Sequence, residues 1–215
     1  ADKSFDRSSQ NGWRGVRTAP SAMKPPPLVQ FDPHMPRLDR PVRADGVLDE
    51  WGRNPAVTLA GPGDVFPVGF RLYPVNGRPP WQGGSDMGAK VYWGWDGEAL
   101  CLAAEVTDDR HLNTQSAGML WNGDAFQAGL VNAKGIDWNF ALALTTNGVA
   151  FHQFAGPDGT LAKVAECSVT RDDKAGITRY GLRLPLAALG LKPGEEFGFN
   201  IMFLDGDDDK GNRYS

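Results

Sequence analysis

Residues 89–106 read Ala-Lys-Val-Tyr-Trp-Gly-Trp-Asp-Gly-Glu-Ala-Leu-Cys-Leu-Ala-Ala-Glu-Val, and this stretch decides the fold class. Two runs rich in apolar residues, 89–95 and 100–106, flank the short segment Asp96-Gly97-Glu98. An Asp-Gly pair between two such runs is a strong β-hairpin signal, because glycine readily takes the positive φ angle of a tight turn. We therefore predict two antiparallel strands joined by a turn.

The same pattern continues toward the C-terminus. Further strands are predicted over 124–131, 138–145, 149–154, 163–170, 177–184 and 197–204, with a second hairpin turn at Asn147-Gly148 and a short helical turn over 185–189. Short strands at intervals of about ten residues, with turn residues between them, are typical of two packed antiparallel sheets. The predicted fold class is all-β, an antiparallel β-sandwich of the jelly-roll or immunoglobulin-like kind.

Residues 1–41 differ from the rest in composition. They hold seven of the 16 prolines and show no hydrophobic period, so we predict an N-terminal arm or linker, followed by one domain over 42–215. Within that domain, residues 45–51 are expected to form a turn and a short helical turn. Residues 61–88 are rich in glycine and proline and are expected to form a long loop that contains Trp81.

Charge and hydropathy exclude two classes of partner. The net charge is −4, but residues 1–43 carry eight Lys or Arg against four Asp or Glu, which leaves a balance of −8 for the remainder. Nucleic-acid binding needs a concentrated basic face, so the acidic domain is not expected to bind DNA or RNA. No apolar stretch reaches the length of roughly 18 residues that a membrane helix needs. Neutral ligands or cations suit this charge better.

Catalytic signatures are absent from the sequence. It contains none of the nucleophile-elbow, zinc-protease, phosphate-loop or dinucleotide-binding motifs, and its carboxylates cluster in turns. We therefore predict a protein that is not an enzyme. Cys101 and Cys167 form no CxxC pair, which argues against zinc and dithiol chemistry. They are either buried free thiols or one disulfide of an exported protein.

Seven tryptophans give the chain aromatic surface for binding. An indole can stack on the flat C–H face of a sugar ring. We expect Trp51, Trp93 and Trp95 to lie in the core. Trp121 follows a polar loop and directly precedes a predicted strand, in Leu120-Trp121-Asn122-Gly123-Asp124, so it is the candidate sugar platform.

A run of carboxylates follows the last predicted strand. Asp205-Gly206-Asp207-Asp208-Asp209 places alternate aspartates on one loop, and calcium prefers such oxygen ligands. A solvated acidic turn explains the run slightly better on spacing alone, since the spacing of a full EF-hand is missing. The residues leave both readings open.

Five stretches, in this order, resemble the family 9 carbohydrate-binding modules within the wider DOMON-like β-sandwich group. They are Asp45–Trp51, Ala89–Leu100, Val106–Asp108, Trp121–Gln127, and Gly198–Ile201 with Asp205 and Lys210–Arg213. The resemblance covers about residues 42–215. It implies a secreted or periplasmic, non-catalytic module that binds polysaccharide or oligosaccharide and targets an attached catalytic domain to glycans.

The resemblance also implies site residues. Trp121 falls on the first of two tryptophans that clamp a sugar, and Gln127 and Asn139 fall near the family's hydrogen-bonding positions. Calcium is implied as a cofactor, with candidate ligands at Asp45, Asp49, Asp108, Asp205 and Asp207. The second clamp tryptophan and the last strand would follow Arg213, so we expect them outside residues 1–215, with further chain or another polypeptide completing the fold.

Two alternatives remain beside carbohydrate binding. One is a structural or interaction domain of a larger exported enzyme. The other is a haem-binding redox domain, because DOMON-like sandwiches also hold haem; its axial ligands would come from His111, His152, Met119 or Met202.

Overall fold

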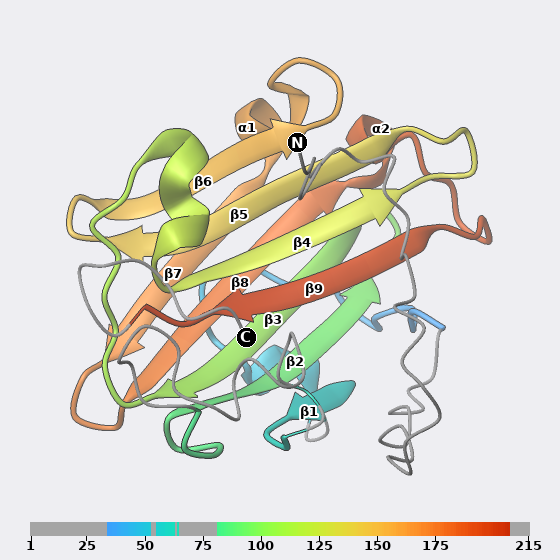
Figure 1. Cartoon of the computed structure of the whole chain (residues 1–215). Coiled ribbons are helices and arrows are strands. Elements are labelled where there is room, and N and C mark those ends of the chain that lie inside the picture. The colour runs from blue at the N-terminus through green and yellow to red at the C-terminus, as the bar shows by residue number, and fades with distance from the viewer. Residues whose placement is uncertain (1–33, 53–54, 63, 65–80, 207–215) are drawn as a thin grey trace, which may run out of the picture.

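The computed structural model describes residues 34–52, 55–62, 64 and 81–206, and they form two packed antiparallel sheets (Figure 1). The five-stranded sheet has the order β1-β2-β3-β8-β7 and the four-stranded sheet the order β6-β5-β4-β9. The strands are β1 (Val57–Leu59), β2 (Met87–Trp95), β3 (Ala99–Asp108), β4 (Ala125–Val131), β5 (Asp137–Thr145), β6 (Gly148–Ala155), β7 (Glu166–Asp172), β8 (Ile177–Pro185) and β9 (Gly198–Leu204). Four short helical segments are η1 (Asp49–Trp51), η2 (Ala117–Asn122), α1 (Thr160–Val164) and α2 (Leu186–Leu189). The prediction of an all-β sandwich is confirmed.

Both predicted hairpins are present. β2 pairs with β3 around Asp96-Gly97, where Gly97 has a φ of 99°, and the carboxylate of Asp96 accepts the backbone N–H groups of Glu98 and Ala99. β5 pairs with β6 around Gly148, which has a φ of 103°. These angles favour glycine, so the turn chemistry sets the register of both hairpins.

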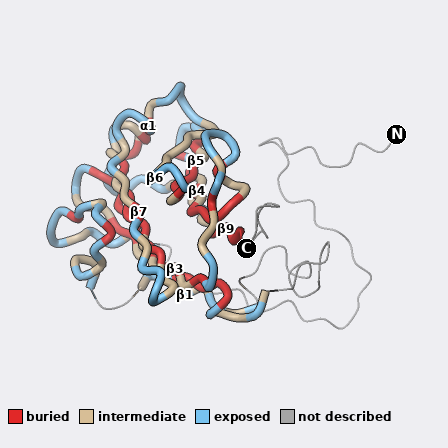
Figure 2. Tube along the Cα trace, turned by 90° about the vertical axis from the view of Figure 1, so that its left-hand side faces the viewer, coloured by how far each residue is buried: buried red, intermediate tan, exposed pale blue. Residues whose placement is uncertain are grey.

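Alternation along the strands builds the core between the sheets. Side chains that face inward from the two sheets form one cluster, which Figure 2 shows as buried segments between the layers. Its largest fully buried members include Trp138, Phe140, Leu142, Leu102 and Leu182. Because successive residues of a strand point to opposite faces, the neighbours of these residues lie on the outer faces.

The outer faces are also partly covered. Leu38, Val42 and Trp51 pack with Ala99 and Cys101 on the outside of the five-stranded sheet. Leu38 donates its N–H to the carbonyl of Trp95 over 2.8 Å, so the described end of the predicted arm lies against β2. On the four-stranded sheet, η2 covers small residues of β4 and β5. The division into an arm and one domain stays a prediction.

The strand predicted over 163–170 is wrong at its start. Residues 160–164 form the helix α1 instead, because Gly159 takes the left-handed conformation and Leu161 inserts fully into the core. Strand β7 then begins at Glu166. Strand β1 was not predicted.

Cys101 and Cys167 are free thiols. No helix among the described residues is long and apolar enough to cross a membrane.

Asp96 ties the first hairpin to β8 through Arg183, whose Nε lies 2.9 Å from Oδ2. Burial raises the pKa of Asp96, but the hydrogen bonds from Arg183, Glu98 and Ala99 outweigh it, so the pKa lies below its ordinary value of 3.8. Stability from this carboxylate is therefore present above that ordinary value and is lost as the pH falls through the folded value.

Replacing Asp96 with asparagine is expected to lower the free energy of unfolding by about 1–2 kcal/mol at neutral pH. Asparagine keeps an oxygen for the turn but loses the charge-assisted bond to Arg183. Urea unfolding of both proteins at neutral and acidic pH measures the effect. The difference should shrink in acid, and a difference that is independent of pH would contradict the assignment.

Candidate functional site

Three neutral amide side chains form a row across the outer face of the four-stranded sheet. Gln127 comes from β4, Asn139 from β5 and Asn200 from β9. The Nε2 group of Gln127 donates to Oδ1 of Asn139 over 2.9 Å. Gly129 lies between Asn139 and Asn200 in the sheet, and a Cβ there would approach Oδ1 of Asn200 to 2.6 Å. The absence of a side chain at Gly129 therefore lets the amide of Asn200 lie over β4.

The amide row borders a cavity of about 390 Å³ at the edge of the sandwich. The cavity reaches around β9 to the end of β1 and the start of β2. Besides the three amides it is lined by Leu59, Ala60, Gly61, Asp64, Trp81, Met87, Gly88, Ala89, Ile201, Met202 and Phe203. Its volume lies within the range of small-ligand pockets, and most of its lining is apolar with few polar groups, as such sites usually are.

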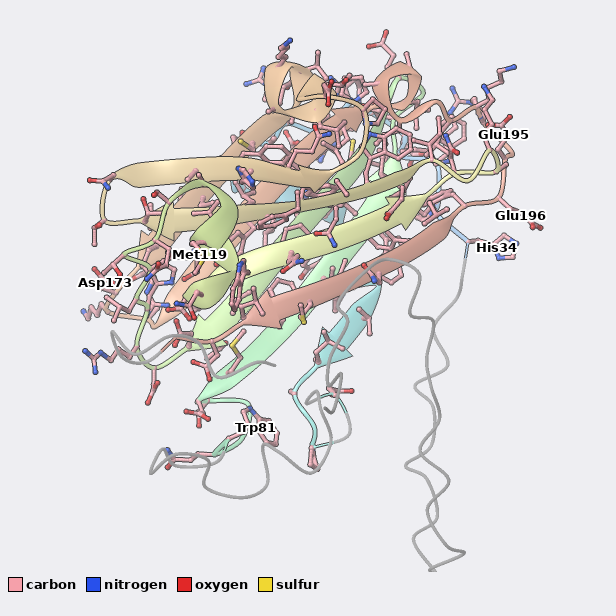
Figure 3. All side chains as sticks on the ribbon, turned by 45° about the horizontal axis from the view of Figure 1, so that its top comes forward. His34, Trp81, Met119, Asp173, Glu195 and Glu196 are labelled. Carbon is pink, nitrogen blue, oxygen red and sulfur yellow. The ribbon has the colours of Figure 1, made fainter. Side chains whose placement is uncertain are left out.

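Trp81 is the aromatic residue that sequence reasoning did not select. Its indole N–H donates to the carbonyl oxygen of Met87 over 2.9 Å, which fixes the ring just before β2 (Figure 3). The side chain is partly exposed and lines the cavity. Its sequence context, a segment rich in glycine and proline, carried no strand or turn signal that would have placed it beside β9.

Trp121 lies elsewhere on the same outer face. It is partly buried at the end of η2 and packs against a small cluster that includes Leu120, Ala125 and Ala141. Met202 packs against the same cluster and lines the cavity, so η2 adjoins the amide row. The structure thus brings Gln127 and Asn139 together in one cavity lining and leaves Trp121 beside it.

A second polar centre lies at one end of the sandwich, where β3 ends and β4 begins. One ligand atom each of Asp108, His111 and Asp124 lie within 4.8 Å of one another. Asp108 and Asp124 are 2 % and 3 % exposed. Asp124 accepts the backbone N–H groups of Leu112 and Gly206, so it links the loop before η2 to the end of β9.

Burial dominates the electrostatics of this centre. It raises the pKa of Asp108, and it raises the pKa of Asp124 well above its usual range, with Asp108 adding repulsion. Burial also lowers the pKa of His111, which favours the neutral imidazole. Arg171 lies 3.5 Å from Oδ2 of Asp108 and donates to its backbone oxygen over 3.0 Å.

The five predicted calcium ligands are not gathered in one place. Asp45 and Asp49 are exposed near η1, and Asp108 belongs to the centre just described. Asp205 is buried close to Asp124, and Asp207 lies outside the described residues. Calcium takes six to eight oxygen ligands, whereas the centre offers two carboxylates and an imidazole nitrogen. This donor set does not match calcium, and calcium elsewhere in the chain stays a prediction.

Solved structures of similar shape identify the fold. A family 9 carbohydrate-binding module from Caldicellulosiruptor kristjanssonii in complex with cellotriose matches with a TM-score of 0.56 and 18% identity, covering 83% of this chain and 80% of that one. Its complex with glucose matches with a TM-score of 0.53 and 16% identity, covering 84% and 82%.

The fold is that of the family 9 carbohydrate-binding modules. The resemblance read from the sequence is thereby confirmed for the family 9 fold. No protein-family model matches the sequence, and no curated protein matches it.

Proposed function

We propose that this chain is a non-catalytic carbohydrate-binding module that holds a neutral saccharide in the cavity beside β9. The observation that carries the proposal is the meeting of three amides, Gln127, Asn139 and Asn200, with the indole of Trp81 around one cavity. An amide offers both donors and acceptors, as a sugar hydroxyl does. The indole offers an apolar face to the C–H groups of a sugar ring.

The similar structures support a glucan as the ligand class, since they contain cellotriose and glucose. The cavity lining supports binding rather than hydrolysis. Glycoside hydrolysis usually needs two carboxyl groups at a fixed separation. Among the described residues that line the cavity, Asp64 is the single carboxylate, and its Oδ2 accepts the backbone N–H groups of Ala60 and Gly61.

The proposed function also includes a role for Trp121 and a cellular location. We propose that Trp121 gives a second aromatic surface on the same face, as the resemblance implies. A module of this kind would act outside the cytoplasm, secreted or periplasmic, and would direct an attached catalytic domain to its glycan.

The four candidate axial ligands of the haem alternative do not meet at the described cavity. Of its four candidates, Met202 lines the cavity, whereas His111, His152 and Met119 are not among the described residues that line it. Nε2 of His111 instead lies 2.9 Å from the carbonyl oxygen of Leu144. Absence of a Soret band in the purified protein would confirm this reading. An interaction domain without a sugar site remains the alternative to test.

Calorimetric titration with cellotriose tests the proposed function. Wild-type protein is expected to bind, and Gln127→Ala is expected to weaken binding by about tenfold, because a net hydrogen bond contributes about 0.5–1.5 kcal/mol and 1.4 kcal/mol is a factor of ten. Gln115→Ala is a matched control, since Gln115 lies in the loop before η2 and contacts Thr114. Lack of any heat with cellotriose, glucose and other neutral oligosaccharides would favour the interaction domain.

A further inference from the structure

The imidazole of His111 is held in one tautomer. Its Nε2 lies 2.9 Å from the carbonyl oxygen of Leu144, and a carbonyl can only accept, so Nε2 carries the hydrogen. The side chain is 10 % exposed. In the neutral ring the lone pair of Nδ1 therefore points into the buried centre at the end of β3.

Nδ1 faces atoms that also carry lone pairs. Oδ2 of Asp108 lies 3.8 Å away, which is too long for a hydrogen bond. Oγ1 of Thr178 lies 3.4 Å away; it accepts a hydrogen bond from Arg171 over 3.0 Å, and its own hydroxyl hydrogen can donate to Nδ1 only over this long distance. A cation between Nδ1 and the carboxylate oxygen would satisfy both lone pairs more fully.

Asp124 completes a group of three donors from separate parts of the chain. Asp108 ends β3, His111 lies three residues later, and Asp124 directly precedes β4. The ligand atoms of all three lie within 4.8 Å of one another, so small side-chain movements would bring them to one ion. Zinc forms bonds of roughly 2.0–2.2 Å to nitrogen and carboxylate oxygen, which places two of its ligand atoms at most about 4.4 Å apart, and the 3.8 Å between Nδ1 of His111 and Oδ2 of Asp108 meets this limit.

The negative charge of the buried carboxylates also favours binding of a cation. Three buried carboxylates, those of Asp108, Asp124 and Asp205, lie in this region, and the guanidinium of Arg171 contacts Asp108. A buried carboxylate is costly unless it is paired or coordinates a metal. One more positive charge would stabilise the ionised form of Asp124.

We propose that Asp108, His111 and Asp124 bind one divalent transition-metal ion of the zinc class, with the fourth position open to water or another donor. One imidazole and two carboxylates suit zinc, cobalt or manganese better than calcium. The carbonyl of Leu144 orients the imidazole, and the backbone N–H groups of Leu112 and Gly206 orient Asp124, as outer partners do in metal sites. The ion would join the loop after β3 to the end of β9.

The wild-type chain, without a polyhistidine tag, tests this directly. Zinc is expected to bind with one-to-one stoichiometry in calorimetry and to raise the melting temperature, because an ion that binds only the folded state stabilises it. Cobalt should give a visible ligand-field band that zinc abolishes and calcium does not. In NMR spectra, zinc should shift the ring signals of His111 alone among the three histidines.

Variants separate this site from surface binding. His111→Gln is expected to weaken zinc binding at least about 10-fold, since losing a ligand costs no less than losing an outer partner, which costs roughly 10- to 100-fold. His152→Gln is the matched control, because His152 lies on β6 against Phe154 and should leave zinc affinity unchanged. The proposal is overturned if wild-type protein gives neither cobalt band nor zinc shift, if His111→Gln binds zinc as tightly as wild type, or if calcium displaces zinc equally well. The NMR signals of the His111 ring in wild-type protein test the zinc site even if a variant fails to fold.

Discussion

Trp81→Ala is expected to weaken saccharide binding roughly 50-fold while the sandwich stays folded. A tryptophan buries about 150–250 Å², and a sugar stacked on one face would cover roughly half of that area. At about 25 cal/mol per Å², the contact contributes roughly 2.5 kcal/mol, which corresponds to this fold-change. The ring lies before β2 and is partly exposed, but it also packs against the main core cluster, so Trp81→Ala should lower stability without unfolding the sandwich.

Two further variants make the result interpretable. Trp81→Phe keeps an apolar ring but loses the N–H that donates to Met87, so binding should fall less than with alanine. Trp121→Ala removes the indole that packs beside the amide row, and its effect on affinity measures how far the saccharide extends toward η2. Calorimetry with cellotriose gives the affinities, and circular dichroism checks the fold. Unchanged affinity in Trp81→Ala would remove Trp81 from the site.

Local turn chemistry explains why the fold was predictable. Asp96-Gly97 and Asn147-Gly148 each stand between apolar runs, and the backbone needs a positive φ at both glycines. Each hairpin is thus encoded within about twenty residues. Strand β1 and helix α1 were missed because their formation depends on distant partners. Val57 and Leu59 pair with β2, and Leu161 is buried in the core.

The candidate site was less predictable for the same reason. Gln127 and Asn139 lie on neighbouring strands, and the resemblance drew attention to both. Trp81 and Asn200 are more than one hundred residues apart, and the cavity that joins them exists only once β1, β2 and β9 are in place. Likewise, the sequence offered His111 only as a candidate haem ligand, because the carbonyl that orients its ring belongs to Leu144 on β5.

Phe140→Ala is expected to lower the free energy of unfolding by about 3–5 kcal/mol, the usual cost of deleting a buried aromatic side chain. Phe140 is fully buried and stacks on Phe151 with ring centroids 5.6 Å apart. Total stabilities of about 5–15 kcal/mol make this a large fraction. Urea unfolding followed by tryptophan fluorescence measures the loss.

Phe154→Ala is the matched control from the opposite face of the four-stranded sheet. Phe154 is partly exposed and packs on His152, so its truncation should cost clearly less than that of Phe140. Equal losses would contradict the division into an inner and an outer face.

Phe140 also faces away from the amide row that its neighbour Asn139 joins. The folded fraction of Phe140→Ala should therefore keep wild-type affinity for cellotriose. Loss of affinity in protein that is still folded would mean that the amide row depends on core packing, and Gln127→Ala would then no longer report on a hydrogen bond alone.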